Sequence, residues 1–285
     1  MTLDEVKLCA DETLTYFLKN MPDVPFTRDD IIIHFTRQKD MARRAKELCK
    51  KYVPDKTIND SQAQQLVTSI AANALIGKEK SAVLVCEDYK TTKKEWRMLF
   101  FHELMHIFCA KTEMDGLHFI DIYGSGTTPE FDPEYAAPEF IIRDGYLSAG
   151  YYIWTEFIAH YYALLKVSGD TYGFPNVVDY VYELLGEVNI ATDELSKGSF
   201  AMACSYLLSC CDVAEILNPP NDIDDNSNEV PYEKENKLAL LNCLRLLHKQ
   251  LQSTKPWRIT EDFIENLGSK YCWFKTTNSM YLANL

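Results

Sequence analysis

Two histidines in the middle of the chain have the spacing of a metal-binding helix. His102 and His106 are four residues apart, and Glu103 directly follows the first of them. On an α-helix, four residues turn through about 400°, so the two imidazoles lie one turn apart on nearly one face. Imidazoles placed in this way can share one zinc ion at nitrogen distances near ~2.1 Å. The sequence therefore predicts a zinc site on this helix.

Glu103 is the residue expected to move a proton in this site. It lies about 100° around the helix from His102, beside the metal rather than on it. A carboxylate in that position can take a proton from a zinc-activated water and pass it to a leaving amine. The HExxH pattern of residues 102–106 therefore predicts a zinc-dependent peptidase with Glu103 as general base and a peptide or protein as substrate.

Two other interpretations of the motif stay open. With six histidines in 285 residues, a chance HExxH is expected in roughly one such chain in a hundred. The histidines would then be core residues of a helical interaction protein. The second alternative is a catalytically silent binding or regulatory protein that keeps a zincin fold. Stoichiometric zinc would exclude the chance motif, and zinc-dependent hydrolysis that is lost in Glu103→Gln would exclude the silent protein.

A catalytic zinc site also needs a third protein ligand. Thr112 stands where a longer HExxHxxGxxH pattern would have another histidine, which leaves His118, Asp121 and Glu156 as candidates. Glu156 is favoured because it lies in an apolar helical pattern, where a buried carboxylate needs a partner and a rigid helix can hold metal geometry. The alternative is that Glu156 is a surface carboxylate or part of a buried ion pair.

Two segments of the chain resemble the ImmA/IrrE-type gluzincin-like metallopeptidases. The sequence WTEFIAHYYA at 154–163 is similar to the E-x-x-A-(D/N)-x-F-A segment of that family, with His160 at the position of the usual Asp or Asn. The run 82–86 followed by 97–106 resembles the family's strand, turn and HExxH helix. The resemblance covers about residues 80–165. It implies a zincin-like fold, Glu156 as third zinc ligand, and cleavage of a specific regulatory protein.

A further polar group should stabilise the charge that develops on the carbonyl oxygen of the substrate. His160, Tyr151, Tyr152 and His118 are the candidates, and the residues alone do not rank them firmly. His160 lies one helical turn after Glu156 and shares its face, so it is included with Glu103 among the predicted catalytic residues. It could instead orient the carboxylate of Glu156.

The elements that must position these residues predict an α+β fold. A zincin-like catalytic region at 1–170, with a small sheet and the HExxH helix, is expected to precede a helical bundle at 171–285. Strands are expected at 30–36 and 81–86 from their β-branched content. Helices are expected up to about residue 20 and at 37–52, 60–76, 92–110, 148–167, 175–187, 192–217 and 233–252.

The segment 111–145 is expected to be a long loop. It contains three Pro-Glu-aromatic units, at 129–131, 133–135 and 138–140, and few periodic apolar positions. Long loops inside compact domains are often functional. Because this segment joins the two predicted metal-bearing helices, we expect it to border the active-site cleft. An irregular surface loop is the other interpretation.

Composition limits the classes of partner. A formal net charge of −13 argues against a nucleic-acid or anionic-membrane partner, and the basic run Lys39–Lys51 is expected to be a solvated helix face. No stretch approaches the ~20 apolar residues of a membrane span. The first residues lack a secretory pattern, and the nine cysteines never have CxxC spacing, which predicts reduced thiols and a cytoplasmic protein. The oligomeric state is left open.

Overall fold

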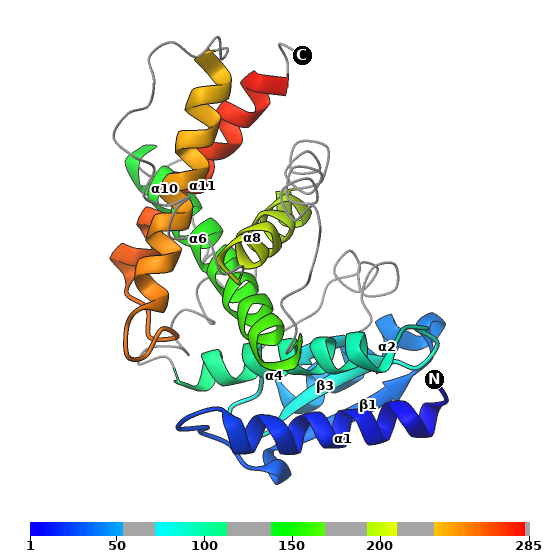
Figure 1. Ribbon diagram of the computed structural model, residues 1–285. Helices are drawn as coiled ribbons and strands as arrows, with labels where there is room; N and C mark the ends of the chain where they lie inside the picture. The colour runs from blue at the N-terminus through cyan, green and yellow to red at the C-terminus, as the bar shows by residue number, and fades with distance from the viewer. Residues whose placement is uncertain (54–71, 113–137, 169–192, 210–230, 283–285) are drawn as a thin grey trace. The chain divides into compact units, whose positions relative to one another are not determined.

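The computed structural model describes five parts of the chain, which are residues 1–53, 72–112, 138–168, 193–209 and 231–282 (Figure 1). Residues 60–71 and 175–187, both expected to be helical, lie outside the described residues. The chain divides into two compact units, each of which is described by itself. The described residues of the first unit are 1–53, 72–112 and 162–168, and those of the second are 138–161, 193–209 and 231–282.

A small mixed sheet lies in the first unit. Its described strands are β1 (Ile31–Thr36), β2 (Ala72–Leu75) and β3 (Ser81–Cys86), in the order β1-β3-β2. β1 pairs with β3 in parallel, and β2 pairs with β3 antiparallel. The two strands expected from their β-branched residues are confirmed, and the described chain has the predicted α+β composition of many helices and a small sheet.

The prediction of a helix over 60–76 is wrong for residues 72–75. This segment reads Ala-Asn-Ala-Leu, and alanine and leucine both favour helices in isolation. In the structure it forms β2, with Ala74 opposite Val83 and Leu75 opposite Ala82. Pairing with the buried strand β3 therefore outweighs the local preference, as tertiary context often does.

β3 is buried along its whole length, which explains why its sequence is apolar at successive positions rather than at alternate ones. Helix α2 (Met41–Tyr52) covers one face of the sheet. The buried side chains that form this contact are Met41, Ala45 and Leu48 of α2 with Leu75, Ala82, Leu84 and Cys86 of the sheet. Val83 and Val85 point to the opposite face and are buried as well.

Helices α1 (Leu3–Asn20) and α4 (Lys93–Thr112) pack against each other through aromatic rings. The ring of Phe17 lies 4.9 Å from that of Phe101 and 6.0 Å from that of Phe108, measured between centroids. All three side chains are fully buried. α1 begins with the expected capping box, in which Thr2 and Glu5 exchange hydrogen bonds. α4, the predicted HExxH helix, is thus held along its length.

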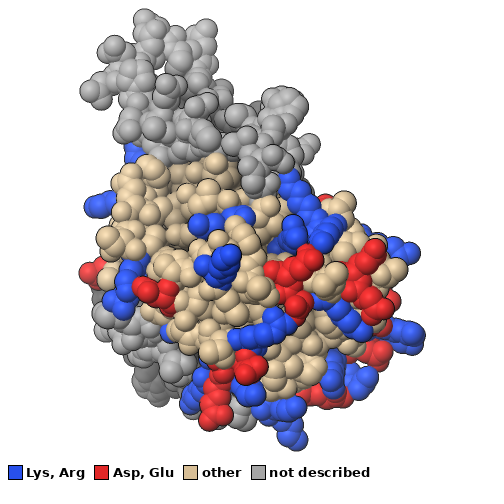
Figure 2. Space-filling model, turned by 60° about the horizontal axis from the view of Figure 1, so that its bottom comes forward, with Lys and Arg blue, Asp and Glu red and all other residues tan. Residues whose placement is uncertain are grey.

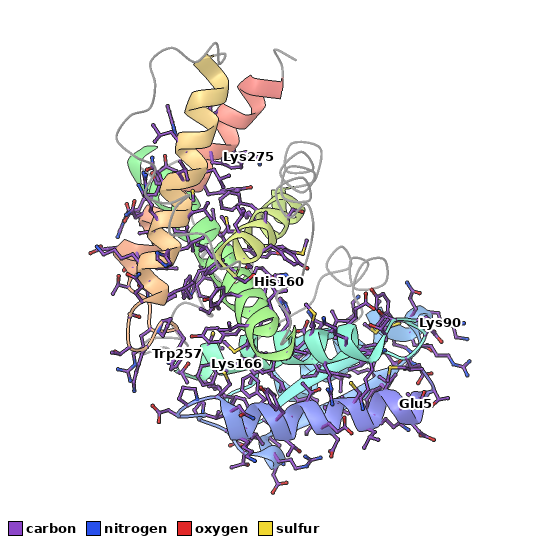
Figure 3. The ribbon with its side chains drawn as sticks, in the orientation of Figure 1. Glu5, Lys90, His160, Lys166, Trp257 and Lys275 are labelled. Carbon is purple, nitrogen blue, oxygen red and sulfur yellow. The ribbon has the colours of Figure 1, made fainter. Side chains whose placement is uncertain are left out.

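The described part of the second unit is helical. It contains α6 (Pro138–Ala163, whose last residues lie in the first unit), α8 (Asp193–Ser209), α10 (Pro231–Leu251) and α11 (Glu261–Leu282). α10 and α11 form an antiparallel hairpin (Figure 1), with Trp257 buried in the connection between them (Figure 3). α8 packs on α11 through Phe200, whose ring lies 5.0 Å from that of Phe274. The helical C-terminal region is therefore confirmed where it is described.

Two helix boundaries differ from those predicted. α6 begins at Pro138, so residues 138–145 are helical and not part of a loop. Proline is compatible with the first turn of a helix because its missing N–H has no partner there in any case. α6 also runs directly into a π-helical segment, η4 (Leu164–Ser168), which belongs to the first unit. The remainder of the predicted loop, 113–137, lies outside the described residues.

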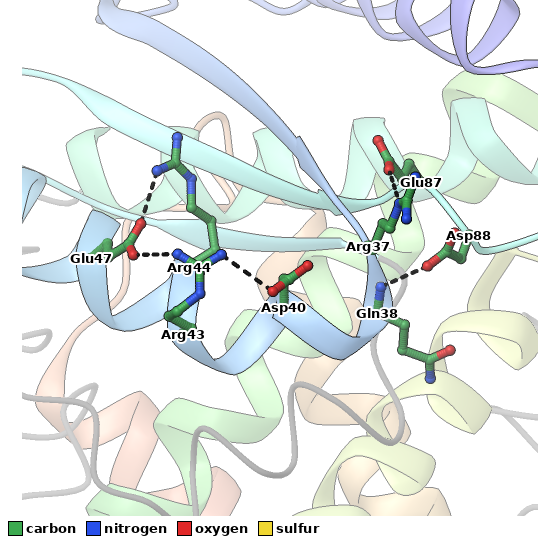
Figure 4. A network of polar contacts seen from close by, with 8 residues as sticks. All are labelled: Arg37, Gln38, Asp40, Arg43, Arg44, Glu47, Glu87 and Asp88. Carbon is green, nitrogen blue, oxygen red and sulfur yellow. Dashed lines mark hydrogen bonds and ion pairs between the residues drawn. The ribbon is translucent and has the colours of Figure 1, made fainter.

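Two arginines of the basic run in α2 are paired with acidic neighbours. Arg43 contacts Asp40 and Glu47 at 3.2 and 2.7 Å, and Arg44 contacts Glu47 at 2.9 Å (Figure 4). Basic and acidic side chains are also interspersed on the face shown in Figure 2. The basic side chains of the run Lys39–Lys51 are exposed except for the half-buried Arg44, as expected of a solvated helix face. In the parts of the chain described above, no helix is both long and apolar enough to cross a membrane.

Candidate metal and catalytic site

The imidazoles of His102 and His106 converge on one face of α4. Their Nε2 atoms are 2.9 Å apart, and their ring centroids are 4.5 Å apart with the ring planes nearly perpendicular. Two nitrogens bound to one tetrahedral zinc ion at ~2.1 Å would be about 3.4 Å apart. The observed 2.9 Å is a hydrogen-bonding distance between the two rings, about 0.5 Å shorter than this value, so both nitrogens are directed to one place and would separate slightly around a metal ion.

Both histidines are partly exposed at the surface of the helix, while the residues around them are buried. Burial lowers the pKa of the His106 imidazole to about 4. The ring is therefore neutral near pH 7, and a neutral imidazole is the form that binds a metal. The helix fixes the direction of both rings, and Nδ1 of His102 is buried.

Glu103 is buried, with 7% of its surface exposed, and its carboxylate is held by the sheet. The backbone N–H of Ala74 donates a hydrogen bond to Oε2 of Glu103 at 2.7 Å. β2 is an edge strand among the described strands, so this N–H points away from β3 and toward α4. The predicted general base is thus anchored by a backbone donor that sequence reasoning missed, since residues 72–75 were expected to be helical.

A second contact ties the same strand region to α4. The ammonium of Lys111, in the last turn of the helix, donates hydrogen bonds to three carbonyl oxygens in the turn between β2 and β3. These are the carbonyls of Gly77, Lys78 and Glu79, at 3.2, 3.1 and 3.5 Å. Burial lowers the pKa of Lys111, and the charge of Asp30 acts in the opposite direction. β2 therefore contacts α4 at Glu103 and is held near its far end by Lys111.

The turn that Lys111 holds has no room for a side chain at Gly77. A Cβ atom there would lie 2.2 Å from the carbonyl oxygen of Lys80 and 2.4 Å from that of Tyr52. Glycine is thus required where the end of α2 and the β2–β3 turn meet. From the sequence alone, a glycine at this position indicates only the end of a helix.

The other two predicted site residues lie one turn apart on α6. Nε2 of His160 is 3.8 Å from Oε2 of Glu156, and both side chains are half-buried (Figure 3 labels His160). Burial raises the pKa of the Glu156 carboxyl, and the charge of His160 opposes this increase. The pair has the geometry expected of a carboxylate with an imidazole that can orient it.

The neighbours of Glu156 on α6 hold the helix rigidly. Ile153 and Phe157 are fully buried, and the ring of Phe157 stacks on that of Tyr161 at 5.8 Å. The hydroxyl of Ser205 in α8 donates a hydrogen bond to the carbonyl oxygen of Phe157 at 3.0 Å. Within the second unit, the helix that carries Glu156 is therefore held by buried side chains and by α8.

The residues present are of the kind that could hold a metal ion. Glu156 and His160 of the second unit offer a carboxylate oxygen and an imidazole nitrogen, and His102 of the first unit offers another imidazole nitrogen. His106 adds a third imidazole beside His102. His118 and Asp121, the alternative third ligands, lie outside the described residues. The choice of Glu156 over them therefore stays a prediction.

Comparison with known proteins gives no further assignment, because no family model, curated protein or solved structure matches this chain. The resemblance to the ImmA/IrrE-type metallopeptidases accordingly stays a prediction from the two sequence segments that carry it.

Proposed function

We propose that this protein is a zinc-dependent peptidase that hydrolyses a peptide bond in a peptide or protein substrate. The observation that carries the proposal is the arrangement on α4, where two imidazole nitrogens 2.9 Å apart lie next to a buried, hydrogen-bonded carboxylate. If the motif were a chance occurrence in a helical interaction protein, the two histidines would be core residues and the protein would bind no stoichiometric zinc.

His102, His106 and Glu156 are the proposed zinc ligands, the His₂Glu set of several catalytic zinc sites. When bound, zinc lowers the pKa of a water molecule and polarises the scissile carbonyl. Glu103 accepts the proton of the attacking water at its carboxylate and then donates it to the leaving amine. His160 either donates a hydrogen bond to the developing oxyanion or orients Glu156, and Tyr151 and Tyr152 on the same helix are the other candidate donors.

The continuity of one helix supports the assignment of Glu156. Residues 162–168 belong to the first unit, where η4 contacts α4 and the hydroxyl of Tyr16 donates to the carbonyl oxygen of Lys166 at 3.1 Å. α6 runs into η4 without a break. At 1.5 Å per residue, Glu156 lies only about 9 Å of helix before Tyr162. The chain thus enters the unit that carries the HExxH helix six residues after the proposed third ligand.

The test measures zinc and turnover separately on the full-length protein. Elemental analysis is expected to give one zinc per chain. A proteome-derived peptide library, read by mass spectrometry, is expected to be cleaved, and the cleavage should stop when zinc is chelated. Glu103→Gln should keep zinc and lose cleavage, since it removes the base and no ligand. A protein without stoichiometric zinc would overturn the proposal, and zinc without cleavage would favour the catalytically silent alternative. We expect the active protein in the cytoplasm.

A further inference from the structure

We propose that the backbone N–H of Ala74 is the positioning group for the catalytic base, holding the carboxylate of Glu103 in the orientation needed for proton transfer. This inference rests on the proposed function. It adds to it a role for strand β2, which carries no residue of the HExxH motif. The observation is the 2.7 Å hydrogen bond from Ala74 N to Glu103 Oε2.

The register of the sheet explains why this donor is available. Ala74 is opposite Val83 and Leu75 is opposite Ala82 in the antiparallel ladder. In such a ladder successive residues direct their N–H groups alternately toward and away from the partner strand. The N–H of Ala74 points to Glu103 and away from β3. The backbone N–H and C=O of the neighbouring Leu75 therefore point toward β3. The edge of β2 thus has a donor at residue 74 that no described strand uses.

The bond is of the strong, charge-assisted kind, at a site where Glu103 is only 7% exposed. A carboxylate on a flexible side chain rotates among several orientations unless one oxygen is fixed. Holding Oε2 also fixes the direction of Oε1, which we assign as the atom that exchanges the proton. Base catalysis requires hydrogen-bond distance and direction, so an unanchored carboxylate would spend less time in the reactive position.

The strand itself is held against α4 at a second point. Lys111 donates to the carbonyls of Gly77 and Lys78, at the end of the turn that follows β2. Residues 103 and 111 are about two helical turns apart on α4. The donor at Ala74 is therefore on a strand that two separate contacts keep beside the helix, which is the rigidity that a positioning group needs.

The contact itself can be measured without zinc or activity. In selectively ¹⁵N-alanine-labelled protein, the Ala74 amide proton should resonate downfield, because it donates to a charged acceptor. In Glu103→Ala this proton should shift upfield. Lys19→Met, an exposed change on α1, should leave it in place. An Ala74 amide proton that does not move in Glu103→Ala would overturn the inference, even if the protein is an active peptidase.

The catalytic role is tested by replacing single backbone N–H groups with oxygen. Lactic acid in place of Ala74 removes only this donor, and the matching α-hydroxy acid in place of Leu75 removes a donor that faces β3. The ester at 74 should keep zinc and lower kcat by roughly ten- to hundredfold, as expected for the loss of a hydrogen bond to a charged group, with a smaller change in KM. The ester at 75 should lower thermal stability but retain most of kcat.

A double variant separates positioning from a general loss of structure. In the Glu103→Gln background the ester at 74 should cause no further loss of the small residual rate measured in single-turnover assays, because its effect acts through Glu103. Equal losses of kcat for the esters at 74 and 75 would overturn the positioning role. So would a loss of kcat at 74 that persists in Glu103→Gln. If the zinc-loaded wild-type protein cleaves nothing, the proposed function fails together with this role, while the amide resonance still reports whether the contact exists.

Discussion

Gly150 of α6 and Gly268 of α11 lie where these two helices cross with their backbones in contact. A Cβ atom at Gly150 would lie 1.9 Å from the carbonyl oxygen of Ile264 and 2.9 Å from the backbone nitrogen of Gly268. A Cβ atom at Gly268 would lie 1.9 Å from the carbonyl oxygen of Tyr146. The two glycines thus permit an approach that no other residue allows, and this approach fixes α6, the helix that carries Glu156.

Gly150→Ala is expected to destabilise the protein, because backbone atoms on α11 cannot move aside as a flexible side chain could. The free energy of unfolding should fall by about 1–3 kcal/mol or more, the range found for overpacked interiors. Gly145→Ala is the matched control on the same helix. A Cβ there meets nothing within 4 Å, so the change should raise stability by roughly 0.5–1 kcal/mol. Urea denaturation measures both, and equal effects at 145 and 150 would contradict the close crossing.

The crossing is accompanied by ion pairs on the same two helices. Arg143 of α6 lies 2.6 Å from a carboxylate oxygen of Glu261 and 2.9 Å from one of Glu265, both on α11. These side chains are about half exposed, so the pairs add little to stability by comparison with the packing of the glycines. We therefore attribute the rigidity of this crossing to the missing side chains of Gly150 and Gly268.

Lys111→Met is expected to loosen the turn between β2 and β3. The change removes the ammonium that donates to the carbonyls of Gly77, Lys78 and Glu79 while keeping most of the aliphatic chain. Since hydrogen bonds to charged groups contribute about 1.5–3 kcal/mol, the free energy of unfolding should fall by about that amount. Amide hydrogen exchange in residues 72–86 should accelerate.

Lys19→Met on α1 serves as the control for removing a lysine charge. Lys19 is exposed, and its replacement should change stability by no more than about 0.5 kcal/mol. Unchanged exchange rates in β2 and β3 of Lys111→Met would show that the lysine does not hold the turn.

The sequence predicted those parts of the fold in which local pattern and tertiary structure agree. β1 and β3 contain β-branched residues, and residues 93–112, with the apolar residues that flank the HExxH motif, form the predicted helix. β2 lacks such a signal, because its strand state depends on pairing with a strand that follows it in the chain. The hydrogen bond from Ala74 to Glu103 depends on that pairing in turn, so this part of the candidate site could not be predicted.

The helix α11 was not predicted, although its sequence contains a helical pattern. Ile264, Leu267, Tyr271 and Phe274 are buried at spacings of three and four residues. Gly268 interrupts this pattern and reads as a helix-breaking residue when taken alone. Its role at the crossing with α6 explains why it is compatible with the helix, and only the partner helix reveals that role.

The stability of the metal-free protein should depend on pH through His106. Burial lowers the pKa of this imidazole to about 4 from its ordinary value of 6.5. Between these pH values the unfolded chain binds a proton that the folded chain does not bind. The contribution of His106 to stability is therefore complete above about pH 6.5 and is lost as the pH falls toward about 4.

His106→Gln isolates this contribution, because it keeps a neutral polar side chain and removes the titration. This comparison is needed because Glu156 has the opposite effect. Burial raises the pKa of the Glu156 carboxyl, so its contribution to stability falls as the pH rises above the ordinary pKa of 4.5. Between about pH 7 and about pH 5, the urea midpoint of the wild type should fall further than that of the variant. Parallel curves would show that the imidazole of His106 is not held neutral in the folded state.

Zinc binding should separate the ligand histidines from the base. His102→Ala and His106→Ala are each expected to lose bound zinc, whereas Glu103→Gln should retain it, since ligands and base have different roles. Elemental analysis and competition with a chromophoric chelator measure the affinity. Full zinc occupancy in either histidine variant would contradict the assignment of that residue as a ligand.

The third ligand can be identified by comparing losses of zinc affinity. Glu156→Gln should weaken zinc binding by more than about a hundredfold, since the change removes the charged ligand atom. His160→Gln should weaken zinc binding by only about ten- to hundredfold if His160 orients Glu156 through their 3.8 Å contact.

His118→Gln and Asp121→Asn, in the segment between the two helices, should leave the zinc affinity unchanged. A loss in His160→Gln equal to that in Glu156→Gln would make His160 a ligand as well. A large loss in either of the other two variants would transfer the third position to that residue and remove the reason for a metal-binding role of α6.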